Sequence, residues 1–387
     1  MKGFAKSSAA YPDRQLPEKI RDGLKVCLKM TGGVGDALIM IGGSAPVLAA
    51  EGAVVTACVP DYQIPLMESL HGVSGAFSAR VIHQPEHYGK FDVIVDFAGV
   101  LANKRELRAG DYYSLTSARV GREVGPGRFT FAHNPLPKPT VAIHAAASNP
   151  NRRWSTARWR VLAWELMDRG FDVLWLGTPD EFGFNSANSQ VLHEISPDLK
   201  WQAEALARCT YFVGNDSGFC HIAGILGIPG VVLFSATKAA DVIARYPLLK
   251  GVEVFDRLGI EPSRSLRPDD KSALRVLANI SVEDVLAVAD LPAPTERKKR
   301  VERMSEKLKL AVVGRTIHSD GLSAFLGQFY EVTLLDNVPD GGTEYAALLI
   351  TDPVDHRVKV RTRDCEVTVD VHNPENVRRA LREVIHR

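Results

Sequence analysis

Short apolar runs rich in β-branched residues recur along this chain, and helical patterns separate them. The clearest runs span residues 25–30, 53–60, 91–97, 140–144, 171–176, 211–213 and 230–234. Strands that alternate with helices pair in parallel, because each helix returns the chain to the same edge of the sheet. The pattern therefore predicts an α/β fold built on parallel sheets.

Two segments show how helices fit this alternation. In residues 155–169, Ser155 is a suitable N-cap, and an apolar face follows at helical spacing, made of Trp159, Leu162, Ala163 and Leu166. The apolar stretch 37–55 is interrupted by glycine, proline and glutamate, so it is too short to span a membrane. We expect it to form a buried helix followed by a strand.

Proline-rich breaks divide the chain, whose 387 residues exceed what one hydrophobic core usually organises. Three prolines between residues 134 and 139 set the first boundary, and a segment with seven basic residues and three glutamates, net charge +4, follows residue 295. We expect Rossmann-like domains at 1–137 and 138–295, a charged linker at 296–309 and a small accessory α/β domain at 310–387. Its candidate strands are 310–313, 331–335, 345–350, 358–361 and 366–371, before a final helix.

Composition excludes several classes of protein. Lys plus Arg at 47 against Asp plus Glu at 46 leaves a net charge of +1, without the basic excess that favours nucleic acid or anionic membranes. Residues 1–24 contain no apolar signal region, so a cytoplasmic location is expected. The cysteines are widely spaced and predict buried free thiols rather than a zinc site or disulfides: Cys27, Cys58, Cys209, Cys220 and Cys365.

The densest chemical signal lies in residues 212–234. A strand ends near Val213 and a helix is expected after Asp216, which places the first turn of that helix at the carboxyl edge of a parallel sheet, where ligands bind. Backbone N–H groups at a helix start attract phosphate, and Gly218 permits close approach. Ser217 and His221, four apart, share a helical face and can both donate to phosphate or sugar oxygens.

Two further segments carry polar groups at strand ends. In residues 30–38, a turn containing Gly33 and Gly35 leads into a helix, and Asp36 lies where the turn meets the helix. The glycine spacing matches neither the dinucleotide-binding motif nor the Walker motif. In residues 144–155, a polar loop carries the paired arginines Arg152 and Arg153, and an arginine fork suits phosphate oxygens.

Each signal also has a purely structural interpretation. Asp216 and Ser217 are common N-cap residues, and His221 fits a hydrogen-bonded interior histidine. The glycines serve tight turns in many proteins, and most arginines are solvated.

Taken together and in this order, the three segments resemble those of the heptosyltransferase-like glycosyltransferases of family 9, which act in lipopolysaccharide biosynthesis. The similarity covers roughly residues 24–290. It implies the GT-B architecture: two Rossmann-like domains with parallel sheets facing a cleft, here plus a small C-terminal α/β domain that the two-domain enzymes lack.

The resemblance also implies roles for individual residues. Asp36 matches the catalytic base, and Gly33 and Gly35 belong to its acceptor-side loop. The donor side comprises Ser148, Arg152, Glu181, Asp216, Ser217, Gly218 and His221, with Arg152 near the phosphates and Glu181 at the nucleotide ribose. This chain departs from the family in two places, with Ala147, Ser148 and Arg152 where hydroxyl residues and a lysine are usual, and with Ser235-Ala236-Thr237 in place of a Gly-Pro-Thr turn.

The expected activity is inverting transfer of a sugar from an ADP-heptose-like nucleotide-sugar to a hydroxyl of a glycan or glycolipid. No cofactor is expected, because the nucleotide-sugar is the substrate. No divalent metal is expected either, since no Asp-x-Asp pair stands in a suitable context.

Three alternatives stay open. Related folds host nucleotide-sugar epimerases and hydrolases, and the loop departures fit a degenerate nucleotide-sugar-binding protein. The acceptor could also be a polyanion such as nucleic acid, bound by the charged linker together with four further basic residues: Arg357, Lys359, Arg361 and Arg363. The competing interpretation of those four residues is an edge strand protected by charge.

Overall fold

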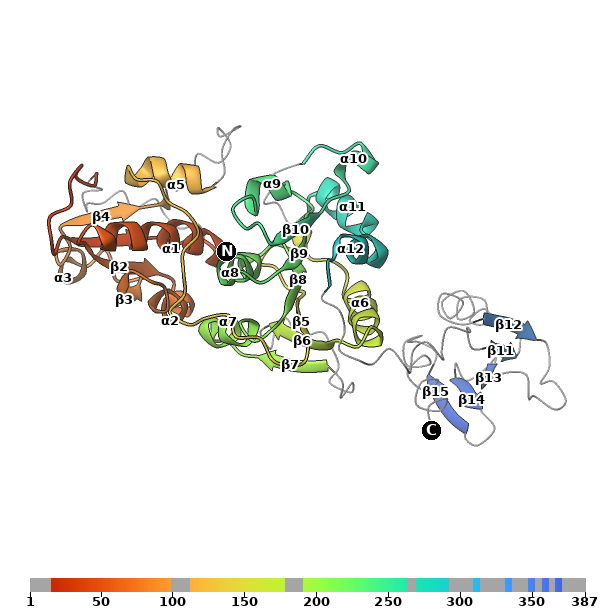
Figure 1. Ribbon diagram of the computed structural model, residues 1–387. Coiled ribbons are helices and arrows are strands. Elements are labelled where there is room, and N and C mark those ends of the chain that lie inside the picture. Colours follow the sequence, from red (N-terminus) through yellow and green to blue (C-terminus); the bar gives the residue numbers. More distant parts are fainter. Residues whose placement is uncertain are drawn as a thin grey trace. The chain divides into compact units, whose positions relative to one another are not determined.

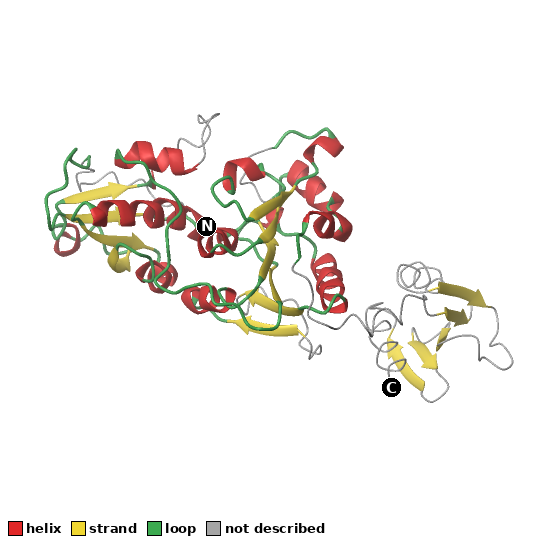
Figure 2. Cartoon of the chain, in the orientation of Figure 1, coloured by secondary structure: helices red, strands yellow, loops and turns green. Residues whose placement is uncertain are grey.

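The computed structural model describes residues 15–98, 112–177, 191–262 and 269–291, and five strands between residues 309 and 370. The chain divides into two compact units, Met1–Thr295 and Glu296–Arg387. In the first unit, helices and strands alternate along the chain (Figure 2). No helix among these residues is both long and apolar enough to cross a bilayer.

The first part of Met1–Thr295 contains a parallel sheet in the order β3-β2-β1-β4. Its strands are β1 (Lys25–Lys29), β2 (Val54–Val59), β3 (Val73–Ser78) and β4 (Val93–Asp96). The helical segments are α1 (Val34–Ala50), η1 (Asp61–Gln63), α2 (Ile64–Glu68), α3 (Pro85–Tyr88) and α5 (Tyr112–Val120).

The second part contains a parallel sheet in the order β10-β9-β8-β5-β6-β7 (Figure 1). Its strands are β5 (Thr140–His144), β6 (Asp172–Gly177), β7 (Val191–Ile195), β8 (Tyr211–Asn215), β9 (Gly230–Leu233) and β10 (Leu249–Val252). The helical segments are η3 (Pro150–Arg152), α6 (Thr156–Asp168), α7 (Leu199–Leu206), α8 (Gly218–Leu226), α9 (Ala239–Val242), α10 (Phe255–Leu258), α11 (Lys271–Asn279) and α12 (Val282–Val288).

The predicted α/β class and the strand runs expected before residue 235 are confirmed. Ser155 caps α6 by accepting the N–H of Arg158, and the expected apolar face of α6 is buried. The structure adds β3, β7 and β10, which the sequence did not indicate, and all three lie at sheet edges. Edge strands bury less surface, so their apolar runs are shorter and weaker.

Helix α1 forms where the long apolar stretch predicted one. Its residues Ala37 to Ala45 are almost entirely buried, because the helix lies between its own sheet and the neighbouring elements α5 and α8. The expected buried, free thiols are confirmed for Cys27, Cys58, Cys209 and Cys220, whereas Cys365 is outside the described residues.

The unit Glu296–Arg387 contains five described strands in the order β12-β11-β13-β14-β15. They are β11 (Lys309–Val313), β12 (Glu331–Leu335), β13 (Ala347–Thr351), β14 (Arg357–Arg361) and β15 (Glu366–Asp370), close to the expected strands. The final helix and most of the charged linker are outside the described residues.

The interpretation of the basic strand as a sheet edge is wrong. β14 pairs antiparallel with β13 on one side and with β15 on the other. The register places Arg357 opposite Asp370 and Arg361 opposite Glu366. The basic residues thus alternate along an inner strand whose partner strand carries acidic positions, so protection of an exposed edge does not explain them.

Candidate active site

The glycine-rich turn after β1 forms the first turn of α1. Gly33 is the N-cap, and its N–H donates to the Asp36 carboxylate oxygen Oδ2 at 3.3 Å. A carboxylate in the first turn is favoured by the positive end of the helix dipole. From the side of β2, the buried Gln63 amide donates to the Gly32 carbonyl at 3.0 Å and braces the turn.

The first turn of α1 packs directly on the first turn of α8. A Cβ on Gly35 would lie 2.5 Å from Cδ2 and 2.9 Å from Nε2 of His221, and one on Gly218 would lie 2.8 Å from the Val34 Cβ. Only glycine permits this approach from either side. Because α1 follows β1 and α8 follows β8, the contact brings the carboxyl edges of the two sheets together.

His221 is linked to the first half of the unit through two tyrosines. Its Nδ1 lies 3.2 Å from the Tyr246 hydroxyl, which lies 2.7 Å from the hydroxyl of Tyr113 on α5. All three side chains are buried. Burial, together with the neighbouring Tyr113 hydroxyl, raises the pKa of Tyr246 well above its usual value, so this phenol keeps its proton.

Arg152, the last residue of η3, pairs with Asp216 at the end of β8. Its Nη1 lies 3.4 Å from Asp216 Oδ2, which also accepts the Thr237 hydroxyl at 2.7 Å. The Arg152 side chain is 21% exposed and that of Asp216 is 5% exposed. The buried carboxylate therefore fixes a guanidinium that still reaches the surface, and the Nε of Arg152 is buried without a hydrogen-bond partner.

The Ser235-Ala236-Thr237 turn joins these two loops. Thr237 binds Asp216 as above, and the Ser235 hydroxyl donates to the Asn151 carbonyl at 2.7 Å. The departure from the family turn thus adds one hydroxyl group, that of Ser235, which ties this turn to the Arg152 loop, while Thr237, a threonine in the family turn as well, binds the Asp216 carboxylate.

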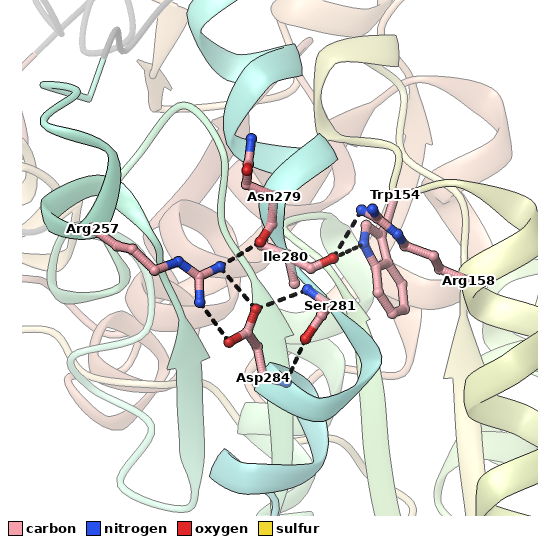
Figure 3. Close-up of polar contacts among 7 residues, drawn as sticks. All are labelled: Trp154, Arg158, Arg257, Asn279, Ile280, Ser281 and Asp284. Atoms are coloured by element: carbon pink, nitrogen blue, oxygen red, sulfur yellow. Dashed lines mark hydrogen bonds and ion pairs between the residues drawn. The ribbon is translucent and has the colours of Figure 1, made fainter. Parts of the chain in front are cut away.

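The loop that carries Arg152 is anchored to the turn between α11 and α12 (Figure 3). The Trp154 indole N–H donates to the Ile280 carbonyl at 2.9 Å, and Arg158 donates to the same carbonyl at 2.9 Å. Ser281 and Asp284 cap α12 reciprocally, and Arg257 binds the Asp284 carboxylate. Within the loop, Arg153 Nε donates to the Ala147 carbonyl at 2.6 Å, so the second of the paired arginines has a structural contact.

The sequence-predicted residues fall into two groups in space. Gly35 contacts Gly218 and His221, and Asp36 follows in the same turn. Arg152 contacts Asp216, while Ser148 is exposed in the loop that precedes η3. Ser217 is the N-cap of α8, and its hydroxyl lies 3.2 Å from Nδ1 of His144. Glu181 is outside the described residues.

The sequence reasoning missed several residues that the structure places around these groups: Tyr113, His144, Thr237 and Tyr246. A signal existed for His144, which is the last residue of a predicted strand. Thr237 stands in the turn that departs from the family. No sequence signal points to Tyr113 or Tyr246, because the residues that they contact are far away in the chain.

The geometry combines three features suited to a bound diphosphate and a reacting hydroxyl: an uncapped helix start, a guanidinium oriented by a buried carboxylate, and a carboxylate in the facing helix turn. Among the described residues, no three His, Cys, Asp or Glu side chains gather as metal ligands would. In the adjacent pair Asp269-Asp270, Asp270 caps α11 by accepting the N–H groups of Ser272 and Ala273.

Comparison with known proteins supports the resemblance. Residues 108–254 match the model of glycosyltransferase family 9 (heptosyltransferase). This segment contains the elements from α5 to β10 and every donor-side residue named above. The resemblance inferred from the sequence is confirmed over this segment. No curated protein matches the chain in sequence.

Several solved structures share the fold. ADP-heptose lipopolysaccharide heptosyltransferase II of E. coli is 16% identical with a TM-score of 0.50, covering 68% of this chain and 98% of that one. A family 9 glycosyltransferase of Veillonella parvula is 14% identical with a TM-score of 0.52, covering 69% and 96%. The iron-containing dodecameric glycosyltransferase TibC of enterotoxigenic E. coli is 15% identical with a TM-score of 0.51, covering 77% and 83%. These likenesses confirm the GT-B fold.

Proposed function

We propose that this chain is an inverting glycosyltransferase that transfers a sugar from an ADP-heptose-like nucleotide-sugar to a hydroxyl of a glycan or glycolipid acceptor. The observation that carries the proposal is the contact between the first turns of α1 and α8, which sets Asp36 beside the turn expected to bind the donor. The family 9 match over residues 108–254 supports the same reaction class.

In this mechanism Asp36 is the general base. Its carboxylate takes the proton of the acceptor hydroxyl while that oxygen attacks the anomeric carbon. The bond from the anomeric carbon to the diphosphate oxygen breaks on the opposite face, so the configuration inverts and the electron pair leaves with the nucleoside diphosphate. A positioned base of this kind contributes about 10²- to 10⁴-fold in rate.

The leaving diphosphate meets positive charge from two sources. Arg152, held by Asp216, supplies a guanidinium with an unused buried N–H, and the start of α8 supplies backbone N–H groups and the positive end of a helix dipole. Ser148 and Ser217 add hydroxyl donors, and Glu181 binds the ribose. His221 supports the donor turn through its contact with Gly35. These groups stabilise the leaving charge, so the proposed reaction requires neither a divalent metal nor a cofactor.

Replacing Asp36 tests the proposal. Asp36→Asn removes the base, so we expect transfer to fall by about 10²-fold or more while nucleotide affinity changes little. The substrates are a panel of ADP-, GDP- and UDP-sugars with oligosaccharide and glycolipid acceptors, assayed in EDTA. The matched control is Asp256→Asn, the same change in the first turn of α10, which should leave transfer unaltered.

Several results would count against the proposal. Full turnover by Asp36→Asn would exclude this residue as the base. An isomerised or hydrolysed donor in the absence of acceptor would favour the epimerase or hydrolase alternative, and absence of binding across the panel would favour a degenerate site. Transfer that needs an added divalent ion would contradict the metal-independent step. The expected cytoplasmic location stays a prediction.

A further inference from the structure

The second sheet changes direction between β5 and β8. The chain runs from β5 outward through β6 to β7, then returns to place β8 on the other side of β5. Ligands of open α/β sheets bind outside the carboxyl ends of the strands at such a switch point. His144 is the last residue of β5 and is in register with Gly214 of β8, so it lies at this position.

His144 is a neutral, buried side chain with defined contacts. It is 5% exposed, and its ring stacks on Phe219 with centroids 4.0 Å apart and planes 15° from parallel. Burial lowers the pKa of His144 to about 3, so the imidazole carries no charge near pH 7. Its effect on a ligand therefore has to come from hydrogen bonding, and the partner observed for Nδ1 is the Ser217 hydroxyl at 3.2 Å.

Ser217 differs from Ser155 and Ser281, which also begin helices among the described residues of this unit. Ser155 and Ser281 accept a backbone N–H of α6 and α12, respectively, with their hydroxyls, as N-cap serines do. Ser217 begins α8 with an extended backbone, φ −152° and ψ 174°, and makes no side-chain cap bond. Its hydroxyl instead points to His144, which leaves the first N–H groups of α8 without a side-chain cap.

We propose that His144 is a positioning residue of the donor site, which holds the Ser217 hydroxyl off the helix cap so that this hydroxyl and the first N–H groups of α8 bind the donor diphosphate. The inference rests on the proposed function, because it assigns a task to a residue beside the proposed donor turn. It adds a residue that acts through Ser217 without touching the donor.

The direction of the hydrogen bond follows from proton counting. A hydroxyl has one proton, and a neutral imidazole has one N–H. Ser217 can donate to a phosphate oxygen only if its proton is not used on His144. His144 therefore carries its proton on Nδ1 and donates to Ser217, which donates onward to the phosphate.

A double-mutant cycle with ADP affinity as the measurement tests this chain of contacts. His144→Phe keeps an aromatic ring against Phe219 but removes the N–H, and Ser217→Ala removes the hydroxyl. We expect each variant to weaken ADP binding about tenfold, the range for one hydrogen bond to a charged group, and the double variant to be weakened about tenfold as well. His144→Asn retains a side-chain N–H donor and should bind within about threefold of the unmodified protein.

Independent losses, with the double variant weakened about a hundredfold, would overturn the inference while leaving the proposed function intact. An equal loss in His144→Asn and His144→Phe would also overturn it. Absence of ADP, GDP and UDP binding by the unmodified protein would overturn both proposals. The protonation site can be measured without any variant, by long-range ¹H–¹⁵N NMR on histidine-labelled protein. A proton on Nδ1 of His144 is expected, and a proton on Nε2 alone would overturn the assignment.

Discussion

At the residue scale, the absence of a side chain at Gly35 decides how the two halves of Met1–Thr295 meet. A Cβ there would lie 2.5 Å from the His221 ring. We expect Gly35→Ala to force the first turns of α1 and α8 apart and to lower the free energy of unfolding by about 1–3 kcal/mol, as overpacking does. Urea denaturation measures this. The control is Gly75→Ala in β3, where a Cβ meets no atom within 4 Å, and equal losses in the two variants would contradict the steric argument.

At the element scale, the turn between α11 and α12 holds the loop that carries Arg152. The Arg158 guanidinium donates to the carbonyls of Leu277, Ala278 and Ile280 at 3.0, 2.9 and 2.9 Å (Figure 3 shows the last of these). Arg158→Met keeps the length of the side chain and loses these donors, so we expect a destabilisation of about 2 kcal/mol, together with weaker nucleotide binding. Calorimetric melting and ADP titration measure the two effects. The control is Arg275→Met, on the exposed face of α11, which should change the free energy of unfolding by less than about 0.5 kcal/mol. Equal destabilisation in Arg158→Met and Arg275→Met would show that the contacts of Arg158 with the three carbonyls are unimportant.

At the scale of the whole molecule, a buried hydrogen-bonded chain joins the two halves of Met1–Thr295. Tyr113 on α5 contacts Tyr246, which contacts His221 on α8. Tyr113→Phe leaves the Tyr246 hydroxyl with one fewer partner, and we expect unfolding to become easier by about 1–2 kcal/mol. The Tyr113 and Tyr246 hydroxyls bind each other, so Tyr246→Phe removes the same hydrogen bond. The double variant should therefore lose less unfolding free energy than the sum of the losses in Tyr113→Phe and Tyr246→Phe. Additive losses in denaturation experiments would contradict a direct link between the halves.

The sequence by itself determined the alternation of strands and helices apart from the edge strands β3, β7 and β10, the buried path of α1, the capped start of α6 and the presence of a helix after Asp216. Each of these depends on residues within a few positions of one another, so local periodicity and capping chemistry are sufficient. Only the tertiary structure decided that Gly35 meets His221, that Arg152 pairs with Asp216 and that Ser217 binds His144 instead of capping α8. It also decided that β14 is an inner strand. The physical reason is that these partners lie tens to hundreds of residues apart or on separate strands, where only the packed sheets bring them together.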